Sequence, residues 1–226
     1  VADPPPPAQV AAADVASITE LIDDIERSSH GVVLVTGKGG VGKTTVARLI
    51  ATALARRGHK VHLSTTDPAG QAAPTAADLS TLTTSAIDPE AATVEYVQTR
   101  LDAAARRGLD AAHIDLLAED LRSPCSQEIA VFGAFHRLLS RGRDQFVVID
   151  TAPTGHTLLL LDVTGAYHRQ AIQGIDARLH VVTPLMRLQD PAYSKVIVVT
   201  LAETTPVGEA TDLQDDLRRA GIEPYG

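Results

Sequence analysis

The segment from Gly37 to Thr45 constrains the fold of this chain more than any other part of its sequence. It follows the apolar run 31–36 and opens the helical pattern 46–55. A strand, a glycine-rich turn and a helix N-terminus in this order are typical of a phosphate-binding loop. The glycines let the backbone curl until several N–H groups face one phosphate, and the helix dipole favours the same anion. The segment therefore predicts a nucleotide site rather than a plain turn between strand and helix.

Two lysines and a threonine give this loop its expected chemistry. Lys43 is expected to reach the β- and γ-phosphates of ATP, and Thr44 to bind Mg²⁺. Lys38, directly after the first glycine, is a second cation that either contacts phosphate or stays solvated. The residues expected to bind the nucleotide are Gly37, Lys38, Gly39, Gly40, Val41, Gly42, Lys43, Thr44 and Thr45.

Apolar runs alternate with helical patterns along the chain. Strands are expected at 32–36, 61–65, 146–149 and 195–201, and a loop at 67–90. Helices are expected at 18–27, 46–57, 90–107, 111–121, 124–141, from about 157, and 206–220. This alternation predicts an α/β fold with a doubly wound, mostly parallel sheet, whose site lies at the carboxyl ends of the strands.

Two carboxylates are expected at that same edge of the sheet. Asp150 ends an apolar strand, where it would hold Mg²⁺ through water, although it could also cap the next turn. Asp67 leaves the second strand, where it would orient or deprotonate the attacking water. The alternative for Asp67 is an ordinary Asp-Pro turn.

Composition excludes several classes of protein. The chain has 226 residues, 44% of them hydrophobic, and a net charge of −8, which argues against non-specific nucleic-acid binding. No apolar run approaches the roughly 20 residues of a membrane span. One cysteine excludes an internal disulfide framework and a Cys-x-x-Cys zinc site, so a reduced cytoplasm is the expected location. Residues 1–17 are rich in proline and alanine and are expected to be a linker before an ATPase domain at 18–226.

Several segments resemble the arsenite-transporting ATPase family, ArsA. They are the loop 37–45 with its second lysine, and the stretches 120–132, 150–162, 164–168, 201–207 and 213–224. Such a loop is similar to the deviant P-loop of the nitrogenase-iron-protein and partition-ATPase superclass. The resemblance covers almost all of 18–226 and is greatest to the second ATPase half of long ArsA chains. It implies a longer protein, of which this chain lacks a C-terminal part with at least one further strand.

The resemblance also implies specific roles. Lys38 would reach the nucleotide of a facing ATPase half, in the same longer chain or in a homodimer, and would act with Lys43 and Asp67 in catalysis. Cys125 would bind As(III) or Sb(III) as a thiolate, with Ser123 and His156 beside it. The expected function is ATP hydrolysis coupled to arsenite or antimonite extrusion, next to a membrane transporter of the ArsB type at the inner face of the plasma membrane. A single cysteine near a helix start could otherwise be a small core residue.

Other functions of the same superclass stay open. A targeting ATPase for tail-anchored membrane proteins would need a methionine-rich groove and a Cys-x-x-Cys seam, whereas this chain has one methionine, Met186, and one cysteine. A partition or positioning ATPase would need a basic DNA-binding surface, which the acidic balance disfavours, or an amphipathic membrane-binding helix at its C-terminus. A non-enzymatic half that serves only as a regulatory interface is the remaining alternative.

Overall fold

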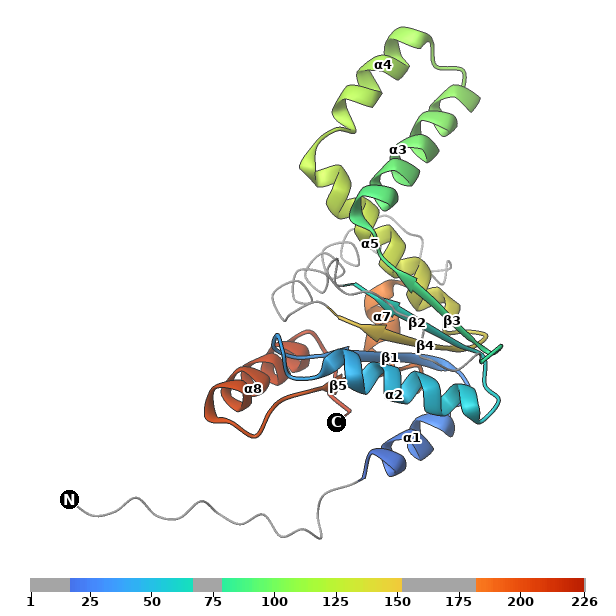
Figure 1. The fold of residues 1–226 in the computed structure, drawn as a ribbon. Coiled ribbons are helices and arrows are strands. Elements are labelled where there is room, and N and C mark those ends of the chain that lie inside the picture. Colours follow the sequence, from blue (N-terminus) through green and yellow to red (C-terminus); the bar gives the residue numbers. More distant parts are fainter. Residues whose placement is uncertain (1–16, 67–78, 152–181, 226) are drawn as a thin grey trace, which may run out of the picture.

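Five parallel strands form one sheet in the computed structural model, which describes residues 17–66, 79–151 and 182–225. The strands are β1 (Gly31–Thr36), β2 (Val61–Thr65), β3 (Leu82–Ala86), β4 (Phe146–Asp150) and β5 (Ser194–Val198), in the order β3-β2-β4-β1-β5 (Figure 1). The described helices are α1 (Ile18–Glu26), α2 (Lys43–Arg56), α3 (Pro89–Arg106), α4 (Ala111–Asp120), α5 (Pro124–Arg141), α7 (Pro184–Gln189) and α8 (Thr204–Arg219). The predicted α/β fold with a parallel sheet is confirmed.

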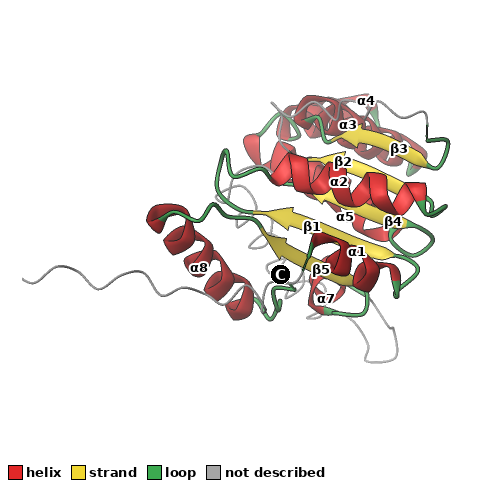
Figure 2. Cartoon of the chain, turned by 60° about the horizontal axis from the view of Figure 1, so that its bottom comes forward, coloured by secondary structure: helices red, strands yellow, loops and turns green. Residues whose placement is uncertain are grey.

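The sheet is buried on both faces, which explains why its central strands are almost wholly apolar. Along β1, Val33 and Val35 pack toward α1 and α2, whereas Val32 and Leu34 pack toward α5, α7 and α8 (Figure 2). Side chains alternate across a strand, so one hexapeptide contributes to two separate cores. The first core is completed by Ile50 and Leu54, and the second includes α5 and α8 side chains.

Strand register brings the predicted site elements to one edge. Asp150 of β4 pairs in register with Val35 of β1 on one side and with Thr65 of β2 on the other. All strand pairs are parallel, so the segments that follow β1, β2 and β4 leave the sheet side by side. The P-loop, the start of the Asp67 segment and Asp150 therefore meet where the sequence predicts, although Asp67 itself lies outside the described residues.

Several predicted boundaries were wrong. The stretch 67–90 was expected to be a loop, yet it contains β3, which reads Leu-Thr-Thr-Ser-Ala. This strand lies at an edge of the sheet and is partly exposed, so it needs no apolar run. Strand β5 ends at Val198 rather than at residue 201, and the short helix α7 was not predicted. The helix expected from about residue 157 lies outside the described residues.

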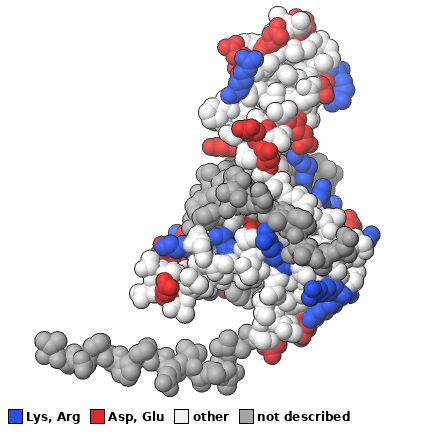
Figure 3. All heavy atoms as spheres, in the orientation of Figure 1, with Lys and Arg blue, Asp and Glu red and all other residues white. Residues whose placement is uncertain are grey.

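Helices α3 and α4 form an arm that extends away from the sheet (Figure 1). Both begin with an aspartate cap: Asp88 accepts hydrogen bonds from Glu90 and Ala91 N–H, and Asp110 from His113 N–H. Such caps stabilise a helix by about 1 kcal/mol, which matters for α4 because it contributes no buried residue among those described. Acidic and basic side chains are intermixed over the arm and the body on the face in Figure 3. None of the described helices is long and apolar enough to cross a membrane.

Candidate functional site

The P-loop is shaped by glycines in backbone conformations that other residues rarely adopt. Gly37 has φ +143° and Gly40 has φ +81°. Gly42 has φ +100° and is the N-cap of α2, where its carbonyl accepts from Val46 N–H at 3.0 Å. Gly39 and Gly40 are exposed, so the backbone of this part of the loop is accessible from solvent. The described loop thus has the form that its sequence predicts.

Replacing Gly37 with alanine is expected to lower the free energy of unfolding by about 2–4 kcal/mol. A Cβ atom at this position would lie 2.2 Å from the carbonyl oxygen of Val199. This oxygen belongs to the backbone, so it cannot move away as a flexible side chain could. Thermal or denaturant unfolding would measure the loss. Gly133→Ala is the matched control, because a Cβ in that part of α5 meets only Arg137 Nη1 at 3.9 Å and alanine favours a helix. Equal stability of the two variants would contradict the close approach at Gly37.

Both P-loop lysines contact other parts of the same chain. Lys43 is 7% exposed, and its Nζ donates to the carbonyl oxygen of Lys38 at 2.8 Å. The ammonium of Lys38 lies 2.6 Å from Oε1 of Glu209 on α8. Glu209 was missed by the sequence reasoning, and no local pattern could have found it, because it lies 171 positions away from Lys38.

Thr44 and Asp150 come together across the edge of the sheet. The Thr44 hydroxyl donates to Oδ2 of Asp150 at 2.7 Å, and Asp150 is only 4% exposed. The carbonyl oxygen of Asp150 accepts from Thr66 N–H at 2.9 Å, which fixes the end of β2 beside it. The residue after Thr66 is Asp67, so the chain enters its undescribed segment next to the Thr44–Asp150 pair.

The predicted metalloid residues are only partly described. Cys125 is exposed in the first turn of α5, so it is not the small core residue that a lone cysteine could have been. Ser123 is the N-cap of the same helix, and its hydroxyl lies 3.2 Å from that of Ser126. His156 lies outside the described residues, so its distance from Cys125 is not tested. Among the described residues, no three His, Cys, Asp or Glu side chains form a metal-binding group.

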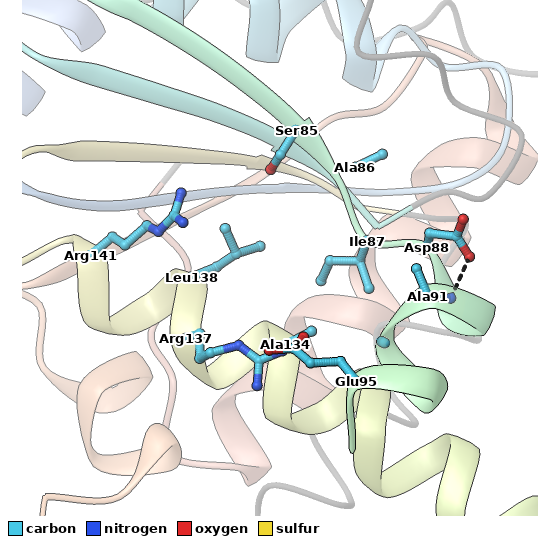
Figure 4. A pocket seen from close by; sticks show the side chains of 11 residues that line it. Ser85, Ala86, Ile87, Asp88, Ala91, Glu95, Ala134, Arg137, Leu138 and Arg141 are labelled. Carbon is cyan, nitrogen blue, oxygen red and sulfur yellow. Dashed lines mark hydrogen bonds and ion pairs between the residues drawn. The ribbon is translucent and has the colours of Figure 1, made fainter. Parts of the chain in front are cut away.

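A cavity of about 340 Å³ lies between β3, α3 and α5 and is separate from the P-loop. Ser85 is on its sheet side, whereas Arg137 lies beside Glu95 between the two helices, at 2.8 Å (Figure 4). Next to Ser85 in the sheet lies His62, which is buried and is hydrogen-bonded to the hydroxyl groups of Thr83 and Ser85. Its Nε2 lies 3.3 Å from Nη1 of Arg141. Burial, and secondarily the Arg141 charge, lowers the pKa of His62, so the ring is held neutral.

Comparison with known proteins agrees with this geometry. The model of the anion-transporting ATPase family matches residues 30–187. This chain belongs to the anion-transporting ATPase family. It is 53% identical over 214 residues to an arsenical pump-driving ATPase of Escherichia coli, which covers 94% of this chain and 36% of that protein. An arsenical pump-driving ATPase of Acidiphilium multivorum is 54% identical over 211 residues, covering 93% of this chain and 36% of that protein.

More distant relatives also match. The ATPase GET3C of Arabidopsis thaliana is 31% identical over 161 residues, which cover 59% of this chain and 41% of that protein. Family membership confirms the predicted resemblance. The chain spans about a third of the length of the arsenical pump-driving ATPases that it matches, 36% in each case above.

Proposed function

We propose that this chain is one ATP-hydrolysing half of an ATPase that drives arsenite or antimonite extrusion. The observation that carries the catalytic part is the bond between Thr44 and Asp150 at 2.7 Å beside the glycine-rich loop. These two side chains would share the shell of a Mg²⁺ ion, while Lys43 and the loop amides would hold the phosphates. Oxygen donors of this kind fit Mg²⁺, which would neutralise charge on the phosphates when bound.

Water activation and the facing half complete the proposed site. Asp67 would orient or deprotonate the attacking water, because it follows directly on the residue that bonds to Asp150. Lys38 would reach a nucleotide held by a second ATPase half, in the same longer chain or in a homodimer. The mouth of the loop is accessible to such a partner, since Gly39, Gly40 and Thr44 are all exposed.

The coupling to metalloid is proposed from Cys125 and from the relatives. As(III) is soft and prefers thiolate ligands, and the exposed position of Cys125 lets a second half contribute further ligands. Ser123 and His156 would complete this half of the metalloid site. Two relatives that align over more than nine tenths of this chain are named arsenical pump-driving ATPases, which supports the same substrate here and a membrane transporter of the ArsB type as partner.

Replacing Cys125 with serine in the full-length protein is expected to spare basal ATP hydrolysis and to remove most stimulation by arsenite or antimonite. Metalloid bound between two halves favours the closed arrangement, and this effect requires tighter binding to that state. ATP turnover measured against metalloid concentration tests the prediction. Gln127→Ala is the matched control, because Gln127 is also exposed in the first turns of α5 but has no thiol. Unchanged stimulation in the serine variant would leave only the general ATPase assignment.

A further inference from the structure

The ion pair between Lys38 and Glu209 joins the P-loop to α8. The ammonium and the carboxylate are 2.6 Å apart, and their side chains are 39% and 42% exposed. The position of Glu209 is restricted, because Leu213 and Leu217 of α8 are buried against the sheet. The pair therefore connects the phosphate loop to a helix that packs on the sheet through Leu213 and Leu217.

The ammonium group of Lys38 cannot bind the Glu209 carboxylate and a nucleotide phosphate equally well at the same time. An ammonium group is a compact charge with three donors, and a carboxylate at 2.6 Å competes with phosphate oxygens for it. The backbone of the same residue is also engaged, since its carbonyl accepts from Lys43 Nζ. Glu209 thus holds, within its own half, the side chain proposed to act on the nucleotide of the facing half.

We infer that Glu209 is a positioning residue that holds Lys38 against its own half and sets how readily Lys38 is released to the facing nucleotide. The inference rests on the proposed function, in which Lys38 acts across an interface. Before the two halves close, the ion pair lowers the fraction of molecules in which Lys38 is free to bind the facing nucleotide. Closing of the two halves replaces the carboxylate of Glu209 by phosphate oxygens.

The expected size of the effect follows from the exposure of the pair. A half-exposed ion pair shifts an equilibrium about 1.4- to fivefold, which corresponds to about 0.2–1 kcal/mol. Glu209 is therefore a moderate restraint, which tunes the resting rate without blocking the reaction.

The test uses Glu209→Gln in the full-length protein. Basal ATP turnover without metalloid is expected to rise about 1.4- to fivefold, whereas turnover at saturating arsenite stays the same, so the stimulation ratio falls. Added salt should raise the basal rate of the wild type more than that of the variant, because salt screens the pair. Asp212→Asn is the matched control: it removes the same charge from an exposed position on the same helix. In a Lys38→Ala background, Glu209→Gln should have no effect.

A second measurement does not depend on ATP hydrolysis. Acylation of lysines, quantified by mass spectrometry, should modify Lys38 about 1.4- to fivefold faster in Glu209→Gln, with the exposed Lys60 as internal reference. Equal labelling, an unchanged basal rate, or an equal fall of basal and stimulated rates would each overturn the role of Glu209. If Lys38 is labelled faster in Glu209→Gln as expected but the wild-type protein hydrolyses no ATP, the proposed function is contradicted and the contact between Glu209 and Lys38 is not.

Discussion

Replacing Lys43 with alanine is expected to abolish ATP turnover by the full-length protein. Lys43 is the buried cation of the loop, and its Nζ donates to the carbonyl oxygen of Lys38. In the proposed function its ammonium binds the phosphates. A preorganised donor directed at charge that develops in the transition state contributes about 10²–10³-fold in other enzymes. Turnover should fall by at least that factor, and Mg-ATP affinity should fall with it.

Two measurements separate this effect from unfolding. Thermal unfolding of Lys43→Ala should remain cooperative, since the truncated side chain is not part of either apolar core. Lys60→Ala, which removes an exposed lysine before β2, should leave turnover and affinity unchanged. Wild-type turnover in Lys43→Ala would rule out the P-loop assignment and, with it, the proposed function.

The parts of the fold that were predicted correctly are those fixed by neighbouring residues. The apolar run of β1, the glycine turn and the start of α2 are contiguous, and so are Ser123 and Pro124 at the start of α5. In each case the local pattern and the tertiary contacts favour the same structure. Strand β3 was missed for the opposite reason, because its polar residues become a strand only by pairing with β2.

The candidate site likewise contains residues that the sequence predicted and contacts that only tertiary packing creates. Thr44 and Asp150 were both expected at the edge formed by the carboxyl ends of the parallel strands, because one follows the loop after β1 and the other ends β4. That β1 and β4 are neighbours was learned from the structure. The contact between Lys38 and Glu209 depends on how α8 packs back over the sheet, and sequence patterns say nothing about that distance. The buried cluster around His62 was missed likewise, because its partners are assembled from β2, β3 and α5.

Asp67→Asn is expected to reduce turnover by about 10²–10⁴-fold while nucleotide binding survives, because an amide cannot accept the proton of the attacking water. Asp150→Asn should behave differently. Its carboxylate accepts from Thr44 at 2.7 Å, so losing the charge should raise the Mg²⁺ concentration needed for half-maximal turnover.

Titrating Mg²⁺ and ATP separately for both variants distinguishes the two carboxylates. The matched control is Asp212→Asn, which removes an exposed carboxylate from α8 and should change neither titration. If turnover falls by less than about threefold in Asp67→Asn, the role of this residue is that of an ordinary Asp-Pro turn. A Mg²⁺ requirement unchanged by Asp150→Asn would mean that the bond between Thr44 and Asp150 shapes the loop without holding the ion. Two distinct phenotypes would establish that neighbouring strand ends supply separate functions, one for the water and one for the metal.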